Sequence, residues 1–337
     1  MNSNGMGIVF RLACVLLVFW AVLASQAAAQ IYHVKEMNTE QIRALDREKT
    51  VVLLPGGILE QHGPYLPSFT DGYQNERLTQ ELANGIVERP GWQVLVFPLI
   101  PLGAGGANEI GSKYSFSGTY AVHSATLRAV FMDLATELGE QGFRWIFVVH
   151  AHGAPSHNRA LDQAGDYFHD NYRGHMVNLT GLMPAREARA EAAQKLMSEE
   201  ERQEEGFAVH ASMNETSRLL FLRPDLVRPT YKHARPHTGR NMDDLISIAK
   251  AENWPGYFGS PRLASAAFGA TLWKQFSSRF IDVALKILDG LDYRQIKRLG
   301  DVAKTVPANV AIDKAALDHD QAIERKQQEW LKKKGLE

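Results

Sequence analysis

The stretch Trp145-Ile146-Phe147-Val148-Val149-His150-Ala151-His152-Gly153 joins an apolar run to two histidines. Five consecutive apolar residues are typical of a strand that is covered on both faces. A similar run, Val51-Val52-Leu53-Leu54, precedes a loop that carries Glu60-Gln61-His62 and then Asp71. Side chains two apart on an extended chain share a face, so we expect Glu60 to converge with His62, and His150 with His152. Carboxylates and imidazoles gathered at strand ends predict a divalent metal site.

Strand-like runs alternate with helical patterns along the chain. Strands are expected at 51–54, 93–100 and 144–149, and helices at 74–88, 123–138 and around 160–168. This alternation predicts an α/β fold, a three-layer α/β/α arrangement with a mostly parallel central sheet. Ligands of such sheets bind at the carboxyl ends of the strands, where the acidic residues and histidines lie.

The composition excludes several classes of protein. The 337 residues are 45% hydrophobic and 22% charged, with a formal net charge of −1, which gives no electrostatic reason to expect a nucleic-acid partner. No Gly-x-Ser-x-Gly follows a strand, which argues against a serine hydrolase. The glycine-rich loop at 103–106 does not complete a dinucleotide fingerprint, because Asn108 stands where the third glycine is needed.

The N-terminal residues 1–29 are typical of a secretory signal peptide. Arg11 precedes an apolar run, Leu12 to Ala24, and small residues follow it up to Ala29, after which we expect cleavage. The protein is then expected to be exported, periplasmic or secreted, without stable membrane insertion; an uncleaved anchor is the alternative. Cys14 is the only cysteine and leaves with the signal, so disulfides and cysteine nucleophiles are not expected.

The remaining chain divides into two parts. Residues 30–295 are expected to form one domain, which carries the candidate metal site, and 296–337 a charged helical tail. Ala185–Glu205 is rich in Ala, Glu, Arg and Lys and is expected to form a solvated helix inserted into the domain.

Several of these residues also have a simpler interpretation, in which they play structural roles and bind no metal. Asp71 follows a proline-rich loop and could cap the next helix. His150 could be a packed, hydrogen-bonded histidine, and His157 a surface residue or one that supports the ligands from behind. A third stretch, 210–217, could be an ordinary helix start capped by Asn214 or Thr216.

Taken together, the three stretches resemble the creatininase (creatinine amidohydrolase) family. That family's first motif is a Pro-Gly turn, Glu-x-His-Gly-x-x-Leu-Pro, and an Asp nine residues after the His; this chain has all of it from Pro55 to Asp71. The second motif, Asn-Gly-His-Gly-Gly-Asn, is altered here to 150–155, His-Ala-His-Gly-Ala-Pro. The third, His-Ala-Gly and then Glu-Thr-Ser, corresponds to 210–212 and 215–217. Weaker similarities are at 116–119 and 256–261, and the resemblance covers 51–288.

The resemblance implies a ligand set for two divalent ions. By this analogy Glu60 and His152 bind one ion, His62 and Glu215 bind the other, and Asp71 bridges them. His210 would lie beside the metals as a proton donor or substrate contact, so that His210, Glu215 and Asp71 are the expected catalytic residues. Such ligands suit zinc, manganese or iron and do not decide among them. Members of the family are commonly hexameric, so the resemblance also implies a homo-oligomer.

The expected function is that of an exported metal-dependent amidohydrolase, which cleaves a linear or cyclic amide C–N bond of a small molecule. Two ions about 3.5–4 Å apart can share a hydroxide that attacks the carbonyl. The alternative is a non-catalytic relative that binds a metal or small ligand. It is motivated by departures from the family pattern at His150, at Ala154-Pro155 and at Lys113, where many relatives carry histidine. These departures concern the substrate pocket, since all five expected ligands remain.

Overall fold

The computed structural model describes residues 30–183, 191 and 193–336, and the expected signal peptide lies outside them. Five parallel strands form the central sheet in the order β1-β3-β2-β4-β5. They are β1 (Gln30–His33), β2 (Thr50–Pro55), β3 (Gln93–Val96), β4 (Trp145–Val149) and β5 (His175–Asn178). The central strand β2 is buried along its whole length, with Leu53 opposite Val96 on one side and Phe147 on the other.

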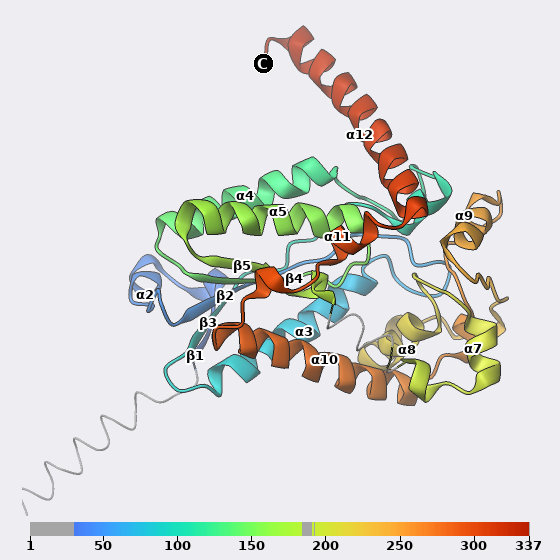
Figure 1. The fold of residues 1–337 in the computed structure, drawn as a ribbon, viewed down its shortest axis with the longest axis horizontal. Coiled ribbons are helices and arrows are strands. Elements are labelled where there is room, and N and C mark those ends of the chain that lie inside the picture. Colours follow the sequence, from blue (N-terminus) through green and yellow to red (C-terminus); the bar gives the residue numbers. More distant parts are fainter. Residues whose placement is uncertain (1–29, 184–190, 192, 337) are drawn as a thin grey trace, which may run out of the picture.

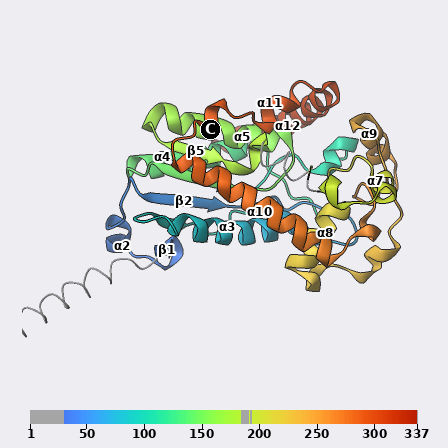
Figure 2. The same ribbon diagram turned by 60° about the horizontal axis from the view of Figure 1, so that its bottom comes forward.

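Helices cover both faces of this sheet (Figures 1 and 2). On one face α3 (Thr70–Val87) and α10 (Ala266–Leu288) pack on Val51 and Leu53. On the other face α4 (Ser124–Glu140) and α5 (Pro155–Tyr172) pack on Val52 and Leu54. Because alternate side chains of β2 enter opposite cores, the strand must be apolar throughout. The expected three-layer α/β/α fold is confirmed.

Shorter elements make up the rest of the described chain. They are η1 (Val34–Glu36), α2 (Thr39–Arg43), η2 (Ala107–Gly111), η3 (Leu179–Gly181), α7 (Glu199–Glu205), α8 (Met213–Leu222), η4 (Pro224–Leu226), η5 (Pro229–His233), α9 (Met242–Lys250), η6 (Pro261–Leu263), η7 (Tyr293–Gln295), α11 (Leu299–Ala303) and α12 (Pro307–Lys334). Helices α7, α8 and α9 lie beyond the carboxyl ends of the strands, at the right in Figure 2. They therefore surround the end of the sheet where the site was expected.

Three element boundaries differ from the sequence prediction. Strand β3 ends at Val96 rather than at residue 100, since Pro98 lacks a backbone donor and restricts the residue before it. Helix α3 begins at Thr70, so Asp71 lies inside its first turn and is not its cap. The single helix expected over 185–205 is interrupted at Ser198, which caps α7 in a capping box; residues 184–190 and 192 of that stretch lie outside the described residues.

The C-terminal helix α12 leaves the body of the protein and projects from it (Figure 1). It has 28 residues and none of them is buried. Within the described part of the chain, no helix is long and apolar enough to cross a membrane.

Candidate metal centre

The loop after β2 delivers Glu60 and His62 to the end of the sheet. This loop is folded rather than extended: the Glu60 N–H donates to Ser68 O (2.8 Å), and the Gln61 N–H donates to Thr119 Oγ1 (3.1 Å). The two side chains do converge, but the expected reason, a continued strand, is wrong because β2 ends at Pro55. Hydrogen bonds that close the loop bring them together instead.

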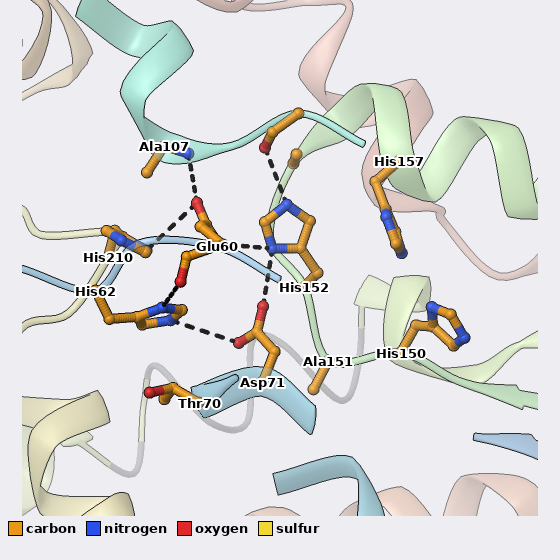
Figure 3. Close-up of polar contacts among 12 residues, drawn as sticks. Glu60, His62, Thr70, Asp71, Ala107, His150, Ala151, His152, His157 and His210 are labelled. Carbon is orange, nitrogen blue, oxygen red and sulfur yellow. Dashed lines mark hydrogen bonds and ion pairs between the residues drawn. The ribbon is translucent and has the colours of Figure 1, made fainter. Parts of the chain in front are cut away.

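Asp71 and His152 reach the same place from two other elements. Asp71 comes from the first turn of α3, where a carboxylate is favourable to the helix dipole. His152 follows β4, and its Nδ1 lies 3.0 Å from Asp71 Oδ2 and 3.3 Å from Glu60 Oε2. Figure 3 shows the three side chains pointing toward one another. All three are buried, with at most 5% of each residue exposed.

Backbone carbonyls orient both imidazoles. His152 Nε2 donates to Gly105 O (2.9 Å), which leaves Nδ1 facing the carboxylates. His62 Nδ1 donates to Glu60 O (2.9 Å), which leaves Nε2 facing Asp71 Oδ1 (3.8 Å) and Glu215 Oε2 (3.7 Å). A histidine that is held through one ring nitrogen and presents the other is the usual arrangement of a metal ligand.

Glu215 enters from α8, the third segment predicted from sequence. The Ala211 N–H donates to its Oε2 (2.8 Å), and Arg218 and Gln74 approach its Oε1 at 3.4 Å each. Ala211 has φ of 48°, a left-handed conformation that alanine rarely adopts. This turn aims its N–H at Glu215 and so fixes the carboxylate toward His62.

The side chains fit two overlapping metal sites. Glu60, Asp71 and His152 form one group of converging ligand atoms, and His62, Asp71 and Glu215 form a second. Donors about 2.1 Å from a tetrahedral ion lie about 3.4 Å apart, and the observed separations of 3.0–3.8 Å bracket that value. Glu60 Oε2 and His62 Nε2 are buried and have no hydrogen-bond partner among the described residues. The donor set therefore suits divalent cations.

The electrostatics of the cluster favour cations as well. Burial raises the pKa of Glu60, but the imidazoles of His210 and His152 outweigh burial and hold that pKa well below its usual range, although burial lowers the pKa of His210 itself. Burial also raises the pKa of Glu215, but the positive charges of His62 and Arg218 outweigh burial and lower this pKa to about 2. Burial lowers the pKa of His152, but Glu60 and Asp71 raise it well above its ordinary value. The proton on the His152 ring stabilises the buried carboxylates, which is the role that a bound metal ion would take over.

His210 lies beside this cluster, as expected. Its Nε2 donates to Gln61 O (2.6 Å), and its Nδ1 is 3.7 Å from Glu60 Oε1. Its ring centroid is 4.3 Å from that of His62. His210 also completes a third group of converging atoms with Glu60 and His62, so its position alone is compatible with a ligand.

His150 does not join the cluster, and the expectation that it converges with His152 is wrong. Strand β4 ends at Val149, and the His150 ring packs edge-on against Phe131, with 5.2 Å between centroids. Figure 3 shows it apart from the carboxylates. Burial, and then the charge on His152, lowers its pKa to about 3, so the ring is neutral. It is packed, as in the simpler interpretation, but neither ring nitrogen has a hydrogen-bond partner among the described residues.

His157 is buried behind His152 rather than on the surface. It lies on α5, accepts the Ala104 N–H at Nδ1 (3.2 Å), and its ring centroid is 5.0 Å from that of His152. It therefore supports the ligand from behind, which is one of the two roles considered for it.

Two supporting residues were not predicted from sequence. Asn75 donates to Gly56 O (2.5 Å) and accepts from the Ala151 N–H (2.8 Å), which ties together the loops after β2 and β4. Arg218 is buried, and its Nε donates to Gln74 Oε1 (2.5 Å). The available signal was helical spacing: Asn75 is four residues after Asp71, and Arg218 is three after Glu215, so each shares a face with an expected ligand.

A cleft of about 380 Å³ opens onto this centre. Glu60, Asp71, His152, His210 and Glu215 all line it. Its volume is in the range of sites for small organic ligands. These five side chains are thus accessible to a substrate, although all of them except Glu215 are buried.

Comparison with known proteins identifies the family. The family described as "Creatininase: Creatinine amidohydrolase" matches residues 35–284. The chain is 32% identical over 124 residues to the mycofactocin precursor peptide peptidase of Mycolicibacterium smegmatis, a match that covers 35% of this chain and only 45% of that protein. It is 27% identical over 254 residues to the peptidase of the same name from Mycobacterium ulcerans, covering 71% of this chain and 86% of that one.

A solved structure described as "Creatininase Mn" superposes with a TM-score of 0.56 and 21% identity, covering 76% of this chain and 98% of that one. At this identity the likeness supports the fold. Fold and family match together define the class as metal-dependent amidohydrolases. Because the family match spans most of the sequence, the chain belongs to the creatininase family.

Proposed function

We propose that the protein is a dinuclear metal hydrolase that cleaves a linear or cyclic amide C–N bond. The observation that carries the proposal is the position of Asp71. Its Oδ2 lies beside His152 and its Oδ1 faces His62, so one carboxylate belongs to both groups of converging ligands. A carboxylate shared in this way is suited to bridge two ions.

The residues that would hold the ions follow from the two groups. Glu60, Asp71 and His152 would hold one, and His62, Asp71 and Glu215 the other. Zinc, manganese and iron all accept such oxygen and nitrogen donors. When bound, a pair of divalent ions lowers the pKa of a shared water and polarises the amide carbonyl.

The chain's own residues supply positioning and proton transfer. The Gly105 and Glu60 carbonyls fix the tautomers of His152 and His62, so the donors are preorganised. His210 lines the cleft with Nε2 engaged by Gln61 O, which leaves Nδ1 as the atom that can carry a proton to the leaving nitrogen. Burial of Glu60, His62, Asp71 and His152 limits the access of bulk water to these groups.

The test is to strip and restore the metal. Purified protein is dialysed against a chelator, reconstituted with zinc, manganese or iron, and assayed on a panel of linear and cyclic amides by release of the amine. We expect activity that is lost with the metal and regained with two ions per chain. Two bound ions without turnover of any amide, before and after reconstitution, would instead support the non-catalytic metal-binding alternative.

Export and self-assembly are part of the same proposal. The sequence pattern of residues 1–29 supports cleavage after Ala29, and N-terminal sequencing of protein from the producing cell should begin at Gln30. Family membership supports a homo-oligomer, which light scattering of the purified protein would test.

A further inference from the structure

Residues outside the family match form part of the cleft wall. The match ends at residue 284. Nevertheless Leu299 of α11 and Asn309, Ile312 and Asp313 of α12 line the same cleft as the metal centre. The family domain therefore does not build this cleft alone.

The first half of α12 is fixed against the body by specific contacts. Arg159 of α5 forms an ion pair with Asp313, with 2.6 Å between Nη2 and Oδ2, and both side chains are only about a quarter exposed. The ring of His319 stacks on Tyr114 with centroids 4.2 Å apart and planes inclined by 9°. In Figure 1 the N-terminal end of α12 meets the body and the rest of the helix projects away from it. The wall residues are consequently held in place and do not belong to a free arm.

The ion pair also lies where the cleft meets a neighbouring cavity. A second cavity, of about 620 Å³, adjoins the cleft, and Gly105, Glu109, Ser156 and Asp313 line both. Arg159 lines the second cavity as well. The Arg159–Asp313 pair therefore lies at this junction, and it positions the turn of α12 that carries Ile312.

Apart from the candidate metal ligands, the cleft is lined by large apolar side chains (Ile110, Val209, Met242, Leu272, Leu299 and Ile312) and by polar ones that include Glu109, Asn309 and Asp313. Arg218 is the one lysine or arginine among the described lining residues, and it is already engaged by Gln74 and Glu215. A substrate in this cleft therefore meets the candidate ligand atoms and, on the C-terminal wall, the hydrocarbon of Leu299 and Ile312.

We propose that the C-terminal segment 299–313 is a specificity-determining wall, which selects amides whose portion remote from the reacting carbonyl is extended and apolar. Each methylene group buried against such a wall strengthens binding about fourfold, so two buried carbons change affinity by about tenfold or more. The inference rests on the proposed function, because it places the reacting carbonyl at the metal centre.

The test compares two hydroxamates on the metal-loaded protein by titration calorimetry. Acetohydroxamate reports on the metal centre alone, and 4-phenylbutyrohydroxamate also reaches the apolar wall. Ile312→Trp places a larger side chain in the cleft, and Ile312→Ala removes the contact between the Ile312 side chain and the bound probe. Ala311→Trp is the matched control, because Ala311 is the exposed neighbour on the same helix and lines neither cavity.

We expect both Ile312 variants to bind 4-phenylbutyrohydroxamate more weakly, about tenfold for Ile312→Trp, with acetohydroxamate affinity and metal content as in the wild type. Ala311→Trp should bind both probes normally. Metal-loaded Ile312 variants that bind both probes like the wild type would refute the specificity role of segment 299–313 and leave the proposed function unaffected. Wild-type protein that takes up no metal and binds neither probe would refute the proposed function, and the role of the wall with it.

Discussion

Asp71→Asn is the most informative single change, because it removes the charge of the shared carboxylate and keeps its shape. In the structure Asp71 is 2% exposed, with Oδ2 3.0 Å from His152 Nδ1 and Oδ1 3.8 Å from His62 Nε2. An amide offers a single acceptor oxygen, and its NH2 group cannot bind a cation. We therefore expect the variant to lose at least one of the two ions.

The size of the effect follows from linkage between binding and folding. An ion present at 100 times its Kd, bound by the folded state only, adds about 2.7 kcal/mol of stability. Two such ions add about 5.4 kcal/mol, which at about 2 °C per kcal/mol raises the Tm of a chain of this size by about 10 °C. Asp71→Asn should show half of this metal-induced shift or less.

The assay is thermal unfolding of chelated protein with and without added manganese or zinc, together with elemental analysis. Glu76→Gln is the matched control, since it makes the same acid-to-amide change at an exposed position of the same helix. The control should keep the full shift and two ions per chain. An Asp71→Asn protein that also keeps both would show that this carboxylate does not bridge metals.

Three further changes have defined outcomes. His210→Ala should retain both metals but slow amide turnover on the order of 10²–10⁴-fold, as steady-state kinetics on metal-loaded protein would show; loss of metal would make His210 a ligand instead. Gly56→Ala should lower the unfolding free energy by about 1–3 kcal/mol, because the added Cβ would overlap the His150 ring, whereas Gly153→Ala has open space and should be neutral. Burial raises the pKa of Asp162 from 3.8 to about 7. Its carboxyl therefore favours folding at low pH, and this contribution is lost as the pH rises from about 4 to about 7. Over that window the stability of the wild type relative to Asp162→Asn should fall by up to about 1.4 kcal/mol per pH unit in denaturant titrations, and a constant difference would contradict the pKa shift.

The arrangement of layers could be predicted from sequence because it depends on local patterns. The run 51–54 is apolar at every position since Val51 and Val52 face different cores, and the periodicity of 123–138 records the buried stripe of α4. The end of β3 was misplaced because the apolar pattern continues through residue 100, although Pro98 interrupts the ladder. Patterns of apolar residues report burial, and hydrogen bonding sets the ends of the elements.

The candidate site was predictable as a set of residues but not as a geometry. Glu60 and His62 converge through a loop closed by Ser68 and Thr119, and these tertiary hydrogen bonds have no local signature. The same limitation explains the error at His150: alternation applies only while the strand continues, and β4 ends one residue earlier.

The most direct measurement is the anomalous scattering of crystals grown with manganese. The account predicts two peaks about 3.5–4 Å apart, one in contact with Glu60 and His152, the other with His62 and Glu215, and both with Asp71. Crystals of active protein with no anomalous peak among these five side chains would contradict it.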